Sequence, residues 1–309
     1  MKRTKWLFLP LMLLAGCAGP VQKPAQQACK IEKVAEVPIS FDQGFLSAPA
    51  TINSQSVTMM VDTGAERTMV TPGAVMALNL ERDAHAQTTI HGTGGTITTQ
   101  NARLGSFGIG GMQVMDRSYA VGELPSMGRF GTAASGLIGA DWLSDFDVDL
   151  DVPNRRMALY KVEGCDGNYV PWQGEHSVVT TYRYGRGLIL VKLTLNGTPA
   201  LAILDSGAEN SLVAVQAATR AGVSPAALQS DRTGHTKGVD GAVQTMHAHR
   251  FDSMDVGSDR VQNATLAVGS LVAPMGAEML LGIDWLRTHR VWIDYRDRRL
   301  FIQRSTPVG

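Results

Sequence analysis

Short apolar runs separated by turn-forming residues follow one another along most of this chain. From Val37 to Ile52 apolar and polar positions alternate, and Asn53-Ser54 forms a turn before the next run. The pattern returns more clearly at residues 182–204, where Asn196-Gly197 separates two apolar runs. Alternation with period two predicts strands, and Asn-Gly between apolar runs is a strong signal for a β-hairpin.

Helix-forming residues are confined to brief stretches. The Ala and Leu spacing of residues 72–80 and 214–223 predicts one short helix in each stretch. Asp-Trp-Leu at residues 141–143 and again at 284–286 predicts a helical turn at each place. The sequence therefore predicts an all-β protein with short helices.

The chain contains one set of motifs twice, 143 residues apart. Asp62-Thr63-Gly64-Ala65 recurs as Asp205-Ser206-Gly207-Ala208. Later, an apolar pair followed by Gly139 recurs as an apolar pair followed by Gly282. A repeat of this length has the size of a lobe, so we predict two homologous β-barrel-like lobes that share one site at a two-fold interface.

Length and composition agree with two lobes of ordinary size. The 309 residues are 44% hydrophobic and 18% charged, which is enough to bury a large core. We place the N-terminal lobe at residues 37–161, a linker at 162–178 and the C-terminal lobe at 179–304, and expect a monomer with a pseudo-two-fold axis. Equal counts of Lys+Arg and Asp+Glu, 28 each, leave no basic field for nucleic acid.

The N-terminus has the features of an export signal. Basic residues precede an apolar run, residues 6–15, that suits the central region of a signal peptide better than a membrane-spanning helix. Leu14-Ala15-Gly16-Cys17 resembles the bacterial lipobox, which implies removal of residues 1–16 and acylation of Cys17. Because Ala18 rather than Asp follows, the resemblance implies a lipoprotein of the outer membrane that faces the periplasm. An ordinary signal peptide with a coincidental Cys is the alternative.

The segment after the signal reads as a tether. Residues 17–36 lack apolar periodicity and contain several Pro and Gln residues. In an oxidising compartment, Cys29 and Cys165 could form a disulfide between this segment and the linker. Two free thiols are the alternative, because pairing depends on the Cα separation.

With both Asp motifs followed by an apolar-apolar-Gly element, the chain resembles the aspartic peptidases, and specifically their retropepsin-like lobes. The resemblance covers residues 37–304 and implies that Asp62 and Asp205 form a catalytic dyad with one shared proton. One carboxyl would then take a proton from a bound water while the other donates toward the peptide carbonyl. The resemblance also implies that Thr63 and Ser206, beside Gly64 and Gly207, lock the two turns together. No cofactor is implied.

Gly-rich hairpins after each Asp motif match the flaps of this family, which close over an extended peptide. They comprise Gly92, Thr93, Gly94 and Gly95 in the first copy and, at a longer offset, Gly238, Val239, Asp240 and Gly241 in the second. An ordinary turn is one alternative. A phosphate-binding loop is disfavoured because no Lys-Ser/Thr follows.

The chain also departs from the family pattern. Ala65 and Ala208 stand where pepsin-like enzymes have a hydroxyl that bonds the catalytic carboxylate. Losing that bond raises a carboxyl pKa, so we expect activity that extends nearer to neutral pH. Retroviral lobes have Arg after the second Gly, where this chain has Ala140 and Ile283, so Glu66 and Glu209 lack their expected ion-pair partner. Arg67 or the Arg pairs at 155–156 and 298–299 are candidates to replace it.

Two other groups of polar residues were weighed as metal ligands. His247 and His249 share a strand face, but no third ligand is apparent. Four acids alternate with apolar residues, as in an amphipathic strand, without a calcium-binding loop: Asp145, Asp147, Asp149 and Asp151. We expect no metal.

The leading hypothesis is a lipid-anchored aspartic endopeptidase that cuts extended segments of envelope or periplasmic proteins, with a preference for apolar side chains beside the bond. A peptide-binding or inhibitory protein that kept the fold and lost turnover is the rival. A glycosidase carboxylate pair is a third possibility. Intact Asp62 and Asp205 with both hydroxyl partners favour the enzyme, because a binding role does not need a like-charge pair.

Overall fold

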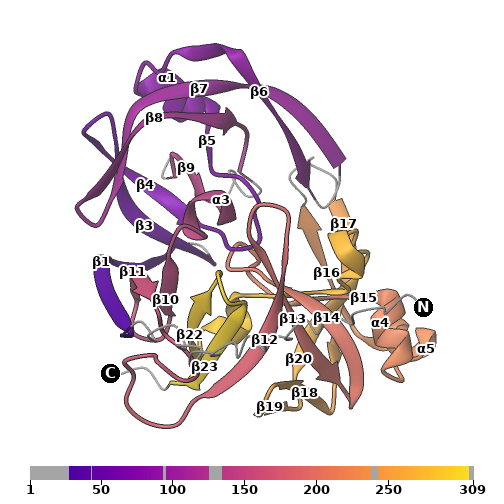
Figure 1. Ribbon diagram of the computed structural model, residues 1–309. Helices are drawn as coiled ribbons and strands as arrows, with labels where there is room; N and C mark the ends of the chain where they lie inside the picture. Colours follow the sequence, from indigo (N-terminus) through magenta and orange to yellow (C-terminus); the bar gives the residue numbers. More distant parts are fainter. Residues whose placement is uncertain (1–27, 43, 93–94, 125–133, 238–242, 306–309) are drawn as a thin grey trace, which may run out of the picture.

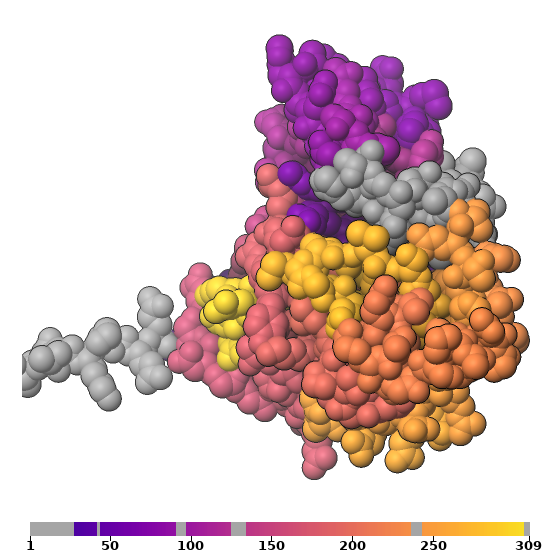
Figure 2. Space-filling view, turned by 90° about the vertical axis from the view of Figure 1, so that its right-hand side faces the viewer, coloured from indigo at the N-terminus to yellow at the C-terminus, as the bar shows by residue number. Residues whose placement is uncertain are grey.

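A computed structural model describes residues 28–42, 44–92, 95–124, 134–237 and 243–305. This part of the chain consists mainly of strands in two sheets, with five short α-helices. Two lobes lie one above the other in Figure 1, and Figure 2 shows the N-terminal lobe in indigo to magenta above the orange C-terminal lobe. The all-β, two-lobed fold predicted from the sequence is confirmed.

The N-terminal lobe is an eight-stranded sheet in the order β2-β3-β4-β9-β5-β8-β7-β6, and an additional pairing of β3 with β7 curls the sheet toward a barrel. Its elements are β2 (Ser40–Asp42), β3 (Phe45–Ile52), β4 (Gln55–Val61), β5 (Met69–Val70), α1 (Pro72–Ala77), β6 (Arg82–Gly92), β7 (Gly95–Ile109), β8 (Met112–Val121), β9 (Gly136–Ile138) and α3 (Ala140–Leu143).

The C-terminal lobe repeats this plan within the fifteen-stranded sheet, in the order β13-β14-β21-β15-β20-β17-β16, with β18 and β19 added at β13. Its elements are β13 (Leu188–Leu195), β14 (Thr198–Leu204), β15 (Leu212–Ala214), α4 (Val215–Arg220), α5 (Pro225–Ser230), β16 (Arg232–Lys237), β17 (Val243–Arg250), β18 (Ser253–Val256), β19 (Asp259–Gln262), β20 (Thr265–Gly269), the 3-10 turn η1 (Pro274–Gly276), β21 (Met279–Leu281) and α6 (Ile283–Leu286).

Six strands, some from each copy, form a central sheet that connects the two lobes, in the order β1-β11-β10-β22-β23-β12. They are β1 (Lys30–Pro38), β10 (Asp147–Asp151), β11 (Arg156–Glu163), β12 (Ser177–Tyr184), β22 (His289–Asp294) and β23 (Arg299–Arg304). The copies meet where β10 pairs antiparallel with β22, with Val148 opposite Ile293. This central sheet places the two lobes in a fixed relation.

Local sequence explains the turns and helix starts. Asn53 and Asn196 both adopt a positive φ of 49°, a conformation that Asn tolerates and hairpin turns require. Thr71 caps α1 by accepting a hydrogen bond from the Ala74 N–H at 3.1 Å, and Pro72 follows at the first turn, where its missing N–H costs nothing. In the described residues no helix is long and apolar enough to cross a membrane.

The tether is shorter than predicted. Lys30–Pro38 form strand β1, which pairs antiparallel with β11 and buries Ala35 and Val37. The composition of β1, which is rich in charged residues, does not predict a strand. An edge strand is held by backbone hydrogen bonds and needs only one apolar face. Cys17 and the rest of the predicted signal lie outside the described residues.

The sequence correctly predicts a strand at the alternating acids, but the expectation that an amphipathic strand turns its acidic face to solvent is wrong. All five residues of β10 are buried. Asp149, which is fully buried, accepts hydrogen bonds from the Arg290 guanidinium at 2.9 and 2.6 Å, and the Arg156 guanidinium lies 3.3 Å away. The acids of β10 therefore join strands and lobes instead of facing solvent.

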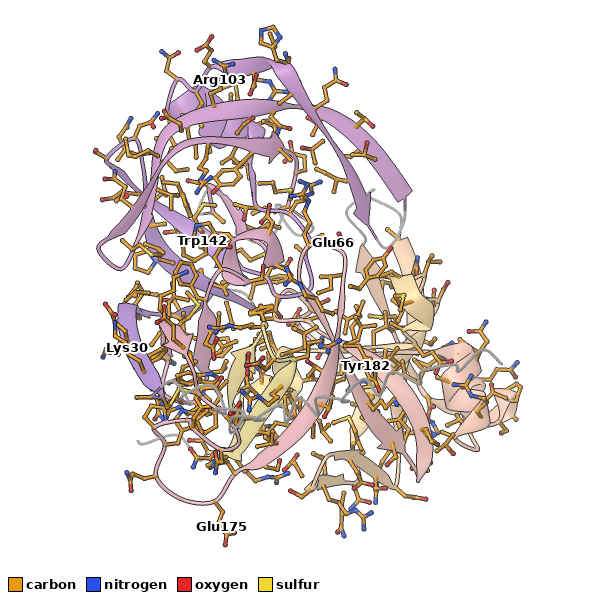
Figure 3. The ribbon with its side chains drawn as sticks, in the orientation of Figure 1. Lys30, Glu66, Arg103, Trp142, Glu175 and Tyr182 are labelled. Atoms are coloured by element: carbon orange, nitrogen blue, oxygen red, sulfur yellow. A yellow bond between two sulfur atoms is a disulfide. The ribbon has the colours of Figure 1, made fainter. Side chains whose placement is uncertain are left out.

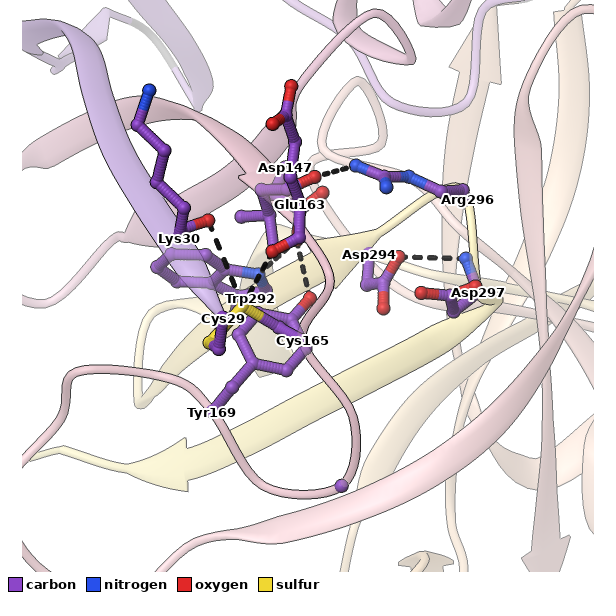
Figure 4. Close-up of a disulfide and its surroundings, with 12 residues drawn as sticks. Cys29, Lys30, Asp147, Glu163, Cys165, Tyr169, Trp292, Asp294, Arg296 and Asp297 are labelled. Atoms are coloured by element: carbon purple, nitrogen blue, oxygen red, sulfur yellow. Dashed lines mark hydrogen bonds between the residues drawn. A yellow bond between two sulfur atoms is a disulfide. The ribbon is translucent and has the colours of Figure 1, made fainter. Parts of the chain in front are cut away.

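The linker is packed and cross-linked. Cys29 and Cys165 form a disulfide with a Cα separation of 4.3 Å, which decides between the two alternatives left open by the sequence (Figure 4). Beyond it, the Tyr169 hydroxyl donates to the buried Asp147 carboxyl at 2.5 Å, and Trp292 Nε1 donates to the same oxygen at 2.8 Å. The linker is thereby fixed on the central sheet.

Candidate active site

Asp62 and Asp205 lie at equivalent places, each directly after an inner strand. Asp62 follows β4 and Asp205 follows β14. The backbone N–H of Asp62 donates to Ile138 at 3.0 Å, and that of Asp205 donates to Leu281 at 2.9 Å. Within each turn, the N–H two residues on donates back to the Asp carboxyl at 2.9 Å. Each carboxyl is thus oriented by its own backbone.

The structure brings the two carboxyls together across the pseudo-two-fold axis. A Cβ placed on Gly64 would lie 2.3 Å from Asp205 Cγ, and a Cβ placed on Gly207 would lie 2.4 Å from Asp62 Cγ. Only glycine leaves room for this crossed arrangement.

Reciprocal hydrogen bonds join the two turns beneath the carboxyls. The Thr63 hydroxyl donates to the Leu204 carbonyl at 2.7 Å and accepts from the Ser206 N–H at 3.0 Å. The Ser206 hydroxyl donates to the Val61 carbonyl at 2.8 Å and accepts from the Thr63 N–H at 3.0 Å. These four bonds are buried, so each polar group depends on the opposite lobe for its partner.

Burial and mutual proximity raise the pKa of both carboxyls. Desolvation raises the pKa of Asp62 well above its usual range, and the charge of Asp205 raises it further. Desolvation likewise raises the pKa of Asp205, to about 6. Asp62 is 8% exposed and Asp205 somewhat more, so both residues keep a small contact with solvent. Chemically, the pair can hold one proton and present one base and one acid.

The apolar-apolar-Gly elements cross behind the Asp turns. β9 runs parallel to β4, and β21 runs parallel to β14. A Cβ on Gly139 would lie 2.6 Å from the Arg67 carbonyl carbon, and one on Gly282 would lie 2.8 Å from the Ala208 oxygen. Glycine is therefore required at both crossings.

Two further carboxylates hold these crossings and were missed as site residues. Asp141 Oδ1 accepts from the Thr68 N–H at 2.8 Å and from its hydroxyl at 2.7 Å, and the same hydroxyl accepts from the Gly139 N–H at 3.0 Å. Asp284 and Ser211 repeat the arrangement in the second lobe. The signal was present in the sequence, since Asp141 and Asp284 are equivalent positions of the repeat.

The predicted flaps lie only partly within the described residues. Strands β6 and β7 form a hairpin that ends with Gly92 opposite Gly95, and β16 pairs with β17 up to Lys237 opposite Val243. Thr93 and Gly94 lie outside the described residues, as do Gly238, Val239, Asp240 and Gly241. Ile97 and Val243 occupy equivalent positions of the two hairpins and are 46% and 66% exposed.

The acid after each Asp motif packs on a glycine of the opposite lobe. Figure 3 shows Glu66 at the boundary between the lobes. A Cβ on Gly185, in the β12–β13 turn, would lie 2.3 Å from Glu66 Oε2. Likewise, a Cβ on Gly44 would lie 2.6 Å from Glu209 Cδ. The arginine of the family pattern is replaced by Ala140 and Ile283 in this chain, and each acid packs against a glycine of the opposite lobe.

Neither histidine of β17 is arranged with further metal ligands. His249 Nδ1 lies 2.6 Å from the Asp231 carboxylate, which forms an ion pair if the imidazole is protonated. Across the described ranges, no group of three or more His, Cys, Asp or Glu side chains is placed to hold a metal ion.

Comparison with known families agrees with this geometry. The family model described as Aspartyl protease matches residues 48–142, and the model described as gag-polyprotein putative aspartyl protease matches residues 191–288. Each matched segment contains one Asp turn and the apolar-apolar-Gly element that crosses it. No curated protein matches the chain significantly.

Proposed function

Because the chain belongs to the retropepsin-like aspartic peptidases, with two lobes in one polypeptide, we propose that it is an endopeptidase whose Asp62 and Asp205 activate a water molecule. The observation that carries this proposal is the crossed placement of the two carboxyls, each against the glycine of the other lobe. A glycosidase pair would place its carboxyls at least about 5 Å apart, which this arrangement does not favour.

The reaction follows from the shared proton. The ionised carboxyl takes a proton from a water molecule, which attacks the carbonyl carbon of the peptide bond. The protonated carboxyl donates its proton toward the carbonyl oxygen as negative charge develops there. Collapse of the tetrahedral species then breaks the C–N bond, and the amine leaves with a proton from the dyad. Each lobe contributes one carboxyl, so a single polypeptide contains the complete dyad.

The raised pKa values support work near neutral pH. Desolvation raises the pKa of both Asp62 and Asp205, and no hydroxyl stands at Ala65 or Ala208 to lower it by bonding the charged form. The singly protonated dyad therefore persists to higher pH than in a dyad with those hydroxyls. We expect the rate of peptide cleavage to extend toward neutral pH, and a profile that peaks only below about pH 4 contradicts this reasoning.

We propose extended polypeptides of the cell envelope as substrates. The exposed apolar side chains of Ile97 and Val243, at equivalent positions of the two hairpins, support a preference for apolar residues beside the bond that is cleaved. The lipobox-like Cys17 supports a lipid anchor in the outer membrane, facing the periplasm. The disulfide between Cys29 and Cys165 fits an oxidising compartment of that kind.

Substitution of each carboxyl tests the proposal. Purified protein without its signal should cleave an unfolded polypeptide, and Asp62→Asn or Asp205→Asn should each abolish cleavage while the fold is retained. Asp252→Asn is a matched control, because this carboxyl is exposed and lies outside the site. If the parent protein binds the polypeptide without cutting it, the rival peptide-binding function replaces this one. If either dyad variant keeps the parent rate, the assignment of the dyad is wrong.

A further inference from the structure

The two copies of the repeat have diverged in charge beside the dyad. Three arginines of one side correspond to uncharged residues on the other: Arg67, Arg183 and Arg186 stand where the other copy has Asn210, Ser40 and Gln43. The neighbouring acids, Glu66 and Glu209, are the same in both copies. The other side has one arginine of its own, Arg287, at the position equivalent to Ser144, so the two sides differ by three arginines to one.

These arginines come together although they belong to different lobes. Arg183 Nη2 donates to the Ser144 hydroxyl and to the Arg186 carbonyl, both at 3.4 Å, and the Ser144 hydroxyl donates to that carbonyl at 3.2 Å. Burial raises the pKa of Asp141, next to this contact, and hydrogen bonds and the charges of both Arg67 and Arg186 oppose the rise. Both guanidinium groups thus act on one carboxyl. We call Arg67, Arg183 and Arg186 the arginine side of the dyad.

The three positive charges of the arginine side outnumber the acids beside them. Within the described residues, the guanidinium groups of Arg67 and Arg186 form no ion pair with an acid. Glu66 lies against Gly185, next to Arg186, and Asp141 interacts with Arg67 and Arg186, so two acids offset at most two of the three positive charges. Arg186 and Arg183 are exposed and Arg67 is half-buried, so a ligand can reach them.

The arginine side lies within reach of a bound peptide. Arg67 is three residues from Gly64, whose Cα lies against the Asp205 carboxyl, so the two Cα atoms are at most roughly 11 Å apart. An extended peptide advances about 3.3 Å per residue. The Arg67 Cα therefore lies no farther from the dyad than the length of roughly two to four residues of an extended peptide.

We propose that the arginine side binds an acidic side chain of the substrate, a few residues to one side of the bond that is cleaved. This inference rests on the proposed peptidase function and adds a specificity to it. A site with two equivalent halves accepts a peptide in either direction. An excess of arginines on one side favours a single direction, so the acid must lie consistently before the bond or consistently after it.

Three peptides with one common apolar cleavage site test this. One peptide has Glu three residues before the bond, the second has Glu three residues after it, and the third has Gln at both positions. We expect kcat/KM for one Glu peptide to exceed that of the Gln peptide by about threefold to tenfold at low salt, and the other Glu peptide to show no gain. Raising the salt concentration should reduce the advantage, because the arginines are partly exposed.

Variants connect the preference to these residues. Arg67→Gln combined with Arg186→Gln should bring the ratio of the favoured Glu peptide to the Gln peptide close to one. Asn210→Arg, at the equivalent position of the other side, should give the second Glu peptide an advantage. Arg220→Gln is the matched control, because Arg220 is an exposed arginine paired with Glu278 at 2.6 Å and should leave the ratio unchanged.

The outcomes separate this inference from the function on which it rests. If both Glu peptides are cut at the rate of the Gln peptide, or if the double variant keeps the parent ratio with an intact fold, the inference is wrong while the peptidase function stands. If none of the three peptides is cut by the parent protein, the proposed function itself fails and the inference fails with it.

Discussion

Gly207→Ala is the smallest change that tests whether the two carboxyls meet as described. Gly207 does not have a positive φ, so alanine can adopt its backbone conformation and only the added methyl group matters. That Cβ would lie 2.4 Å from Asp62 Cγ and 2.5 Å from both carboxylate oxygens, against 3.4–4 Å for ordinary contact. Either the carboxyl or the turn must move by about 1 Å, and a displacement of that size costs about 100-fold in rate when it affects a catalytic group.

The assay is kcat and KM for a peptide substrate, together with the melting temperature. We expect Gly207→Ala to lower kcat about 100-fold while the protein stays folded. Gly73→Ala is the control, because in helix α1 the new Cβ meets nothing closer than Thr71 Oγ1 at 3.8 Å. It should keep the parent kcat and gain up to about 1 kcal/mol of stability. If Gly207→Ala keeps the parent kcat, the Asp62 carboxyl does not lie against this turn and the geometry is refuted.

Four further predictions concern stability. Ser206→Ala leaves a buried N–H and a buried carbonyl of the opposite lobe unpaired, and should lower the free energy of unfolding in urea by about 1–3 kcal/mol for each group. Asp149→Ala removes the fully buried carboxylate that Arg156 and Arg290 share, leaves them Asp151 at 3.5 Å as their buried partner, and should cost about 3 kcal/mol in the same titration. Replacing Cys29 and Cys165 by Ser, or reducing the disulfide, should cost about 2–5 kcal/mol and lower the melting temperature. Desolvation raises the pKa of Asp205 in the folded protein to about 6, above its pKa in the unfolded chain. The contribution of Asp205 to stability is therefore complete at pH values below the pKa of the unfolded chain, and it is lost as the pH rises through 6. Asp205→Asn should reduce this dependence in unfolding curves recorded between about pH 4 and pH 8.

The sequence predicted the elements that depend on local pattern or on the repeat. Asn196-Gly197 fixes a hairpin through its own backbone preference, and the structure has β13 and β14 on either side of it. The two Asp turns were found because a motif that recurs at constant spacing must occupy equivalent places. The meeting of Asp62 and Asp205 then follows from two-fold symmetry, which needs no side-chain detail.

The sequence could not predict what distant segments supply to each other. Strand β1 looked like a tether because its hydrogen bonds go to β11, more than a hundred residues away. The acids of β10 looked solvated because their partners, such as Arg290, belong to the other copy. Similarly, the packing of Glu66 on Gly185 joins opposite lobes. The periodicity and composition of a segment report only on residues that are close in the chain. These contacts instead depend on which distant segments pair in the folded protein.

The central sheet gives a physical reason why both lobes belong in one chain. In the β10–β22 pairing, Asp149 lies opposite Trp292 and Asp151 lies opposite Arg290. By the offset of the repeat, Trp292 is the counterpart of Asp149, and Arg290 is the counterpart of Asp147. Two N-terminal lobes paired in the same way would therefore place Asp149 opposite Asp149 and Asp151 opposite Asp147, and would lose the Arg290 guanidinium that binds Asp149. Like charges directly opposite each other destabilise a strand pair, and buried ones do so strongly. Divergence of the second copy thus selects the pairing of one N-terminal lobe with one C-terminal lobe, and the same divergence beside the dyad allows the two sides of the site to recognise different residues.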